Sequence, residues 1–111
     1  MDIDLIIDGL NELSDINEQE RLWLSDGMGG KEVSSFDEAS ERIFSDSRFT
    51  FECSTGAIQM EKMVISKLWS LGQLLTKSSG NDVCSIKFIH SQEMNEIRIA
   101  AKECLEIISA Q

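Results

Sequence analysis

Residues 57–77 carry apolar side chains over a wide arc of a helical wheel, and this feature most constrains how the chain folds. Their sequence, AIQMEKMVISKLWSLGQLLTK, repeats apolar residues at the three- and four-residue spacing of an α-helix. The apolar set is Ile58, Val64, Ile65, Leu68, Trp69, Leu71, Leu74 and Leu75. An arc this wide predicts a central, largely buried helix against which other elements pack.

Three more segments combine helical spacing with residues that start a helix. Asp15 predicts the start of a helix to about Leu24, with Glu18 as a capping-box-like partner. Ser35 predicts a helix to about Asp46, and Ser91 one to about Ser109. Their predicted inward side chains are Ile16 and Trp23, then Phe36, Ala39, Ile43 and Phe44, then Met94, Ile97, Ala101, Cys104, Leu105 and Ile108.

Residues 3–13 predict a further helix with an apolar face and an acidic face. The apolar face holds Ile3, Ile6, Ile7, Leu10 and Leu13, and the polar face holds Asp4, Asp8 and Glu12. Like charges four residues apart repel each other by a few tenths of a kcal/mol in an isolated helix, so about that much stability is lost per pair.

Five amphipathic helices joined by short connections predict an all-α fold, a compact bundle forming a single domain over residues 1–111. Two segments with alternating apolar residues, near 48–53 and 83–89, leave an α+β alternative open. If the two segments pair as strands, the class becomes α+β. If they lie over the core as extended loops, the fold stays all-α.

Composition places the chain among ordinary globular proteins. Its 111 residues suit one domain, with 41% hydrophobic and 27% charged residues.

The opening MDIDLIIDGL is acidic where a signal peptide is cationic, and no apolar run has the length of a membrane helix. Cys53, Cys84 and Cys104 are an odd, widely spaced set, which fits a reducing compartment and buried thiols. We expect a cytoplasmic protein that does not bind membranes.

The net charge of −10 comes wholly from the first half of the chain. Residues 1–55 hold 14 acids and 4 bases, whereas residues 56–111 hold 6 of each. This asymmetry argues against nucleic acid as a partner, because phosphates would be repelled. Solubility alone would not concentrate the charge, so an acidic face for a basic protein partner is favoured.

Several acids stand where helix electrostatics would place a base or a neutral residue. Asp26 follows the predicted end of one helix and Asp46 lies at the end of the next, where the helix dipole disfavours negative charge. Asp37 and Glu41 repel each other across one turn. The predicted partner-binding surface runs from the helix that starts at Asp15 through the end of the helix that starts at Ser35, and it includes the glycine loop at 27–30 between them. Its residues are Asp15, Glu18, Asp26, Asp37, Glu38, Glu41 and Asp46.

Motifs for catalysis, metals or cofactors are weak. His90 is the only histidine and the cysteines lack C-x-x-C spacing, so we predict no metal site and no cofactor. GMGGKE fails as a phosphate-binding loop because Ser25 and Glu32 occupy the diagnostic positions. DIDLIIDG fails as a calcium loop because Ile6 replaces the third oxygen ligand. We therefore expect no enzyme and name no catalytic residue.

Three segments resemble small immunity proteins of bacterial contact-dependent growth inhibition and related polymorphic toxin systems. They are LWLSDG at 22–27, SSFDEASERIFSDS at 34–47 and HSQEMNEIRIAAKECLEII at 90–108. The resemblance covers under half of the chain and includes no diagnostic motif. It implies an intracellular antidote that binds a cognate toxin domain. The toxin's activity is not implied by the resemblance; the acidic charge separately favours a nuclease, because a nuclease cleft must be cationic to hold phosphate.

The sequence leaves two other classes of function open besides the immunity protein. One is a regulatory adaptor or structural subunit whose working surface is an apolar groove between helices, with binding that is insensitive to salt. The other is a small hydrolase that uses a cysteine with His90.

Overall fold

Helices make up 83% of the structure, a computed structural model that describes residues 1–24, 35–78 and 86–110. No β-strand occurs in these ranges, so the all-α prediction is confirmed. In chain order the elements are α1 (Ile3–Ser14), α2 (Ile16–Trp23), α3 (Phe36–Glu41), the π-helical segment η1 (Arg42–Asp46), α4 (Phe49–Thr55), α5 (Lys62–Ser78), α6 (Ile86–Ile89) and α7 (Gln92–Ser109).

The predicted helix starts have the expected caps. The Asp15 carboxylate accepts hydrogen bonds from the backbone N–H groups of Asn17 and Glu18 at the start of α2. Ser35 and Ser91 cap α3 and α7 in the same way. The central helix begins at Lys62, five residues later than the predicted position 57, and Ile58 lies half-buried before it.

Where the structure describes them, at 49–53 and 86–89, the two alternating segments are helical rather than strands or extended loops. Residues Phe49–Thr55 form α4, and Ile86–Ile89 form the single turn α6. Phe49 is buried and Cys53 half-buried, which is the i, i+4 spacing of one helix face, while Phe51 is 54% exposed. The spacing of these residues therefore fits both the two-residue alternation of a strand and the four-residue spacing of a helix face, and tertiary packing selects the helix.

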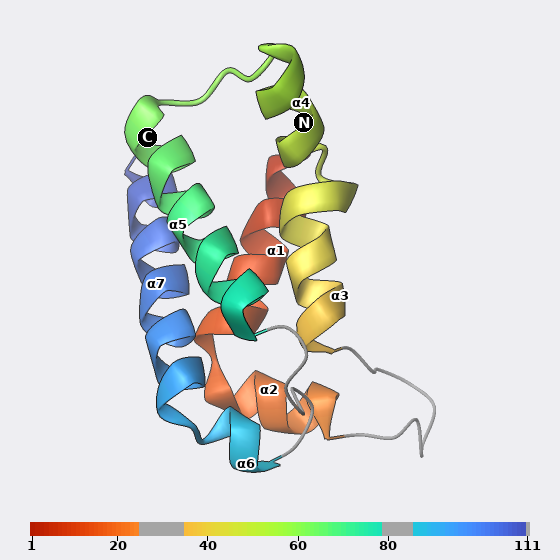
Figure 1. The fold of residues 1–111 in the computed structure, drawn as a ribbon, viewed down its shortest axis with the longest axis vertical. Helices are drawn as coiled ribbons and strands as arrows, with labels where there is room; N and C mark the ends of the chain where they lie inside the picture. Colours follow the sequence, from red (N-terminus) through yellow and green to blue (C-terminus); the bar gives the residue numbers. More distant parts are fainter. Residues whose placement is uncertain (25–34, 79–85, 111) are drawn as a thin grey trace.

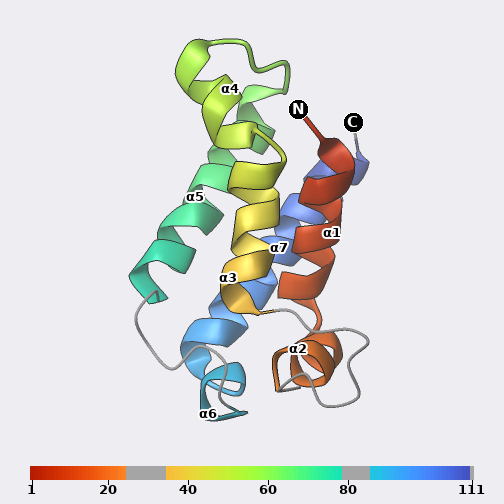
Figure 2. The same cartoon turned by 90° about the vertical axis from the view of Figure 1, so that its right-hand side faces the viewer.

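The four longest parts of the fold stand side by side as a bundle (Figures 1 and 2). α5 packs along α7, α7 along α1, and α1 along α3 and η1. α2 and α6 cover one end of this bundle. α4 lies at the other end beside the N-terminus, and the C-terminus lies at that same end next to the start of α5 (Figure 1).

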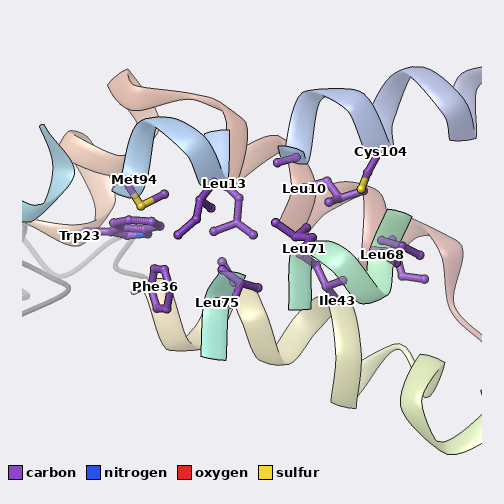
Figure 3. Packing of buried hydrophobic residues seen from close by; sticks show 14 of the residues in the cluster. Leu10, Leu13, Trp23, Phe36, Ile43, Leu68, Leu71, Leu75, Met94 and Cys104 are labelled. Carbon is purple, nitrogen blue, oxygen red and sulfur yellow. The ribbon is translucent and has the colours of Figure 1, made fainter. Parts of the chain in front are cut away.

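The core runs along the axis of the bundle and takes residues from every helix (Figure 3). Leu10 and Leu13 of α1 point into it opposite Leu71 and Leu75 of α5 (Figure 3). Its buried apolar members are Ile6, Leu10, Leu13, Leu22, Trp23, Phe36, Ala39, Ile43, Phe49, Val64, Leu68, Leu71, Leu75, Phe88, Ile89, Met94, Ile97, Ala101 and Cys104.

Gly9 sets the closest approach between α1 and α3–η1. A Cβ atom built on Gly9 would lie 2.6 Å from Cγ1 of Ile43 and 2.9 Å from the backbone oxygen of Ala39. Both distances are too short for real contacts, so only glycine permits this crossing. The crossing holds α3 and η1 firmly against α1.

Candidate functional site: an acidic helix beside an apolar groove

α3 and η1 form a continuous helical stretch with one buried face and one acidic face. Its buried face, Phe36, Ala39 and Ile43, packs into the core as predicted, and Phe44 is half-buried. The solvent-facing side chains include four exposed carboxylates: Asp37, Glu38, Glu41 and Asp46. Among the described residues none of the four makes an ion pair.

Arg42, the basic residue within α3–η1, is directed at α1. Its Nη1 lies 2.7 Å from Oδ2 of Asp8, and its Nη2 lies 2.7 Å from Oε1 of Glu12. Burial lowers the pKa of this guanidinium, but hydrogen bonds and charges from Glu12 and Asp8 outweigh the effect and raise the pKa above its ordinary value. Arg42 therefore neutralises acids of α1.

The acidic face predicted for α1 is correct only in part. Glu12 is buried at 6% exposure, where its Oε2 accepts a 2.7 Å hydrogen bond from Nε1 of Trp23. Asp8 is paired with Arg42, which leaves Asp4 as the exposed member without an ion pair among the described residues. Burial of a carboxylate requires a charged partner, and the sequence pattern of α1 alone could not show that Arg42 supplies it.

The remaining predicted site residues are not equivalent to the α3–η1 acids. Asp15 is occupied in capping α2, and Glu18 pairs with Arg21 at 2.6 Å rather than completing a capping box. Trp23, at the far end of α2, meets Phe36 of α3 at 6.0 Å between ring centroids. Asp15 and Glu18 lie at the start of α2, so the length of this helix, about 12 Å, separates them from the contact between α2 and α3. Asp26, the loop at 27–30 and Cys84 lie outside the described residues.

A groove opens between α3–η1 and α5. Its volume is about 620 Å³, which is within the range of ligand sites. α3 and η1 contribute Phe36, Asp37, Ser40 and Phe44; α4 contributes Thr50; α5 contributes Trp69, Gly72, Gln73, Leu75, Thr76 and Lys77. The groove therefore adjoins the acidic face, with Asp37 at its edge.

Aromatic rings hold the walls of the groove together. Phe44 packs edge-on against Phe49 at 5.8 Å, and Phe49 packs against Trp69 at 5.9 Å between centroids. Gly72 lets the Phe44 ring approach α5, because a Cβ there would already lie 3.4 Å from Phe44 Cζ. Trp69 remains 44% exposed.

Sequence reasoning missed this groove because Trp69 was assigned to the buried arc of the central helix. The sequence signal that could have revealed the groove is a second row of residues on this helix, offset by one position from the buried row. Val64, Leu68, Leu71 and Leu75 are buried, whereas the row one residue later, Ile65, Trp69, Gly72 and Thr76, is partly or fully exposed. An apolar arc too wide for one seam indicates a second surface.

Neither of the thiols that the structure describes, Cys53 and Cys104, is hydrogen-bonded to His90. The His90 Nε2 lies 2.7 Å from Oε1 of Glu20. Burial raises the pKa of the Cys53 thiol despite a hydrogen bond with Trp69, and burial raises the pKa of Cys104 to about 11. An activated cysteine needs the opposite shift.

In residues 1–24, 35–78 and 86–110, no three His, Cys, Asp or Glu side chains gather closely enough to hold a metal ion. Within the same ranges, no helix combines the length and apolar character needed to cross a bilayer. Asp2, from the rejected calcium motif, instead caps α1 through the N–H of Leu5.

Comparisons with models of protein families, with characterised proteins and with solved structures give no match.

Proposed function

We propose that this chain is an immunity protein that binds and neutralises a cognate bacterial toxin domain, with a nuclease as the leading case. The exposed carboxylates of α3 and η1 occupy the toxin's cationic active-site cleft, and substrate is excluded without any covalent change. The antidote acts in the cytoplasm of the cell that makes it, where its cysteines stay reduced.

The observation that carries this proposal is a difference between two sets of acids in the first half of the chain: Asp8 and Glu12 of α1 have a basic partner, whereas those of α3 and η1 have none among the described residues. Arg42 is committed to Asp8 and Glu12, while Asp37, Glu38, Glu41 and Asp46 have no ion pair with the described residues. Asp37 and Glu38 complement the helix dipole in the first turn of α3, but Glu41 and Asp46 lie too far along to gain from it, and Glu41 repels Asp37 across one turn. A cationic partner gains electrostatic steering, with association rates up to about 10⁸ M⁻¹s⁻¹ at low salt.

The test begins with the protein encoded next to this chain. Its C-terminal domain is expressed in a bacterial host, and growth is followed with and without this chain. We expect the domain to arrest growth and this chain to restore it. The double variant Asp37→Lys/Glu41→Lys should lose protection while its circular dichroism spectrum stays unchanged. A non-toxic neighbour, or full protection by the double variant, would contradict the proposal.

A second candidate is favoured by the groove between α3–η1 and α5. A regulatory adaptor or structural subunit would use Phe36, Phe44 and Trp69 as an apolar seat for a partner helix. Its binding would be insensitive to salt and to reversal of Glu41. The same measurements therefore separate the two functions.

A further inference from the structure

The groove is the open side of an otherwise closed bundle. Direct helix packing joins α5 to α7, α7 to α1, and α1 to α3–η1. Between η1 and α5 the contact is made by side chains, chiefly the Phe44 ring lying on Gly72. Figure 2 shows α3 and α5 as neighbouring helices on this side of the molecule.

The dimensions of the groove suit a short helix. Its lining spans Phe36 to Phe44 on one side and Trp69 to Lys77 on the other, eight residue steps each. Eight steps along a helix are about 12 Å, or a little over two turns. A docked helix of that length presents apolar residues at i, i+4 and i+7, which is the usual pattern of helix-in-groove recognition.

Polar side chains line the groove from three elements: Asp37 and Ser40 from α3, Thr50 from α4, and Gln73, Thr76 and Lys77 from α5. The Thr76 hydroxyl already donates to the backbone oxygen of Gly72 at 2.9 Å. Small-molecule sites instead concentrate a few polar groups that fix one orientation. The arrangement therefore favours an extended occupant.

Charge determines the character of that occupant. Asp37 lines the groove. Glu41 is not a lining residue, but it follows Asp37 by one turn on the exposed side of α3, so a second carboxylate lies just outside that edge. Of the described side chains that line the groove, Lys77 is the basic one, and it lies at one end. A helix with Lys or Arg along its α3-facing flank satisfies both carboxylates.

We infer that the groove between α3–η1 and α5 receives a cationic amphipathic helix of the partner protein. Its apolar residues seat over Phe36, Phe44 and Trp69, and its basic flank pairs with Asp37 and Glu41. Trp69 then becomes a buried anchor, as exposed tryptophans at interface centres commonly do. This inference rests on the proposed function, because it assigns the helix to the toxin domain.

The groove is blocked by one substitution with a matched control. Ser40→Trp places an indole in the groove from α3, whereas Ser70→Trp places one on an exposed part of α5 outside the lining. Gln73→Trp is a second blocking variant from the opposite edge, in case Ser40→Trp fails to fold. Circular dichroism and thermal unfolding establish that each variant is folded.

The probe is a displayed library of 14-residue helical peptides, selected on the wild-type chain. We expect enriched peptides with apolar residues at i, i+4 and i+7 and a Lys- or Arg-rich flank. By fluorescence polarisation they should bind the folded blocking variants at least 10-fold more weakly than wild type or Ser70→Trp. Failure to enrich such peptides, acidic winners, or equal binding to the blocking variants would overturn the inference. So would a concentration-dependent dimer of wild type that Ser40→Trp abolishes.

The toxin assay separates this inference from the proposed function. If wild type protects cells, the blocking variants should lose protection and Ser70→Trp should keep it. Protection that survives both blocking variants would overturn the groove inference and leave the antidote function standing. If wild type itself gives no protection, the antidote function fails, and the peptide selection alone decides whether the groove binds a cationic helix.

Discussion

Arg42 holds Glu12 in the core: its Nη2 lies 2.7 Å from Oε1 of a carboxylate that is only 6% exposed. The other Glu12 oxygen accepts from Trp23, so one buried charge joins α1, α2 and η1. The acidic face of α3–η1 is oriented by this link, because Arg42 belongs to the same helical stretch as Glu41.

Arg42→Met should destabilise the protein by about 3 kcal/mol, since it leaves the Glu12 carboxylate buried without its counter-ion. Arg42 is itself partly exposed, which places the expected loss at the low end for broken buried pairs. Urea denaturation followed by circular dichroism measures the change. Arg21→Met, which breaks an exposed pair with Glu18, should cost no more than about 0.5 kcal/mol. Equal losses in the two variants would contradict the role given to Arg42.

Gly9→Ala and Gly72→Ala should change stability in opposite directions. The Gly9 substitution forces a methyl group against Ile43 and the Ala39 backbone, which should cost about 1–3 kcal/mol. The Gly72 substitution meets only the Phe44 ring at 3.4 Å and gains helix propensity, which should add about 0.5–1 kcal/mol. Urea midpoints of the two variants against wild type give both signs. Losses of similar size would show that α5 is as tightly packed on η1 as α1 is.

Cys104 should make the protein less stable at alkaline pH. Burial raises its pKa from 9.0 to about 11, so between these values the unfolded chain releases the proton while the folded chain keeps it. Stability is therefore fully present below pH 9 and falls toward pH 11, by about 2–3 kcal/mol for a two-unit difference. Cys104→Ala should show a shallower decline in urea midpoints over this range. An equal decline of the urea midpoints in wild type and in Cys104→Ala would mean that the thiol has the same pKa in the folded and the unfolded chain.

The helices α1, α2, α3–η1, α5 and α7 could be predicted from sequence, whereas α4, α6 and the side-chain partners between helices could not. Local capping by Asp15, Ser35 and Ser91 needs only neighbouring backbone, and the structure confirms all three. Glu12 needs Arg42, 30 residues away, and no local pattern reveals that pair. The alternation of Phe49, Phe51 and Cys53 favoured a strand because period-2 spacing and i, i+4 spacing coincide at the first and third of these residues.

The candidate site was predictable in part for a similar reason. Asp37, Glu38, Glu41 and Asp46 lie on the exposed face that helical spacing assigns them, whereas Glu18 has an ion-pair partner, Arg21, on its own helix. The groove depends on α5 packing against α7 and leaving Trp69 uncovered. Such packing is a property of the assembled bundle.

Glu41→Lys should stabilise the isolated protein slightly while weakening partner binding. It replaces repulsion from Asp37 with attraction across one turn, a gain of about 0.5 kcal/mol at low salt. Glu106→Lys on α7 should change stability by less than about 0.5 kcal/mol, because repulsion from Lys102 four residues earlier is offset by the helix dipole and by Glu103 three residues earlier. Thermal unfolding at low and high salt measures both effects. A large loss of stability in Glu41→Lys would give Glu41 a structural role in place of the proposed one.

The most direct test of the acidic face is the association rate with the toxin domain, measured by stopped flow across a range of NaCl concentrations. We expect wild type to associate fast at low salt and Glu41→Lys to be about 10-fold slower, with the difference shrinking as salt rises. Glu106→Lys, an equal charge change on α7, should alter the rate less than about twofold. Equal effects of the two reversals, or a rate independent of salt, would contradict the claim that α3–η1 meets a cationic partner.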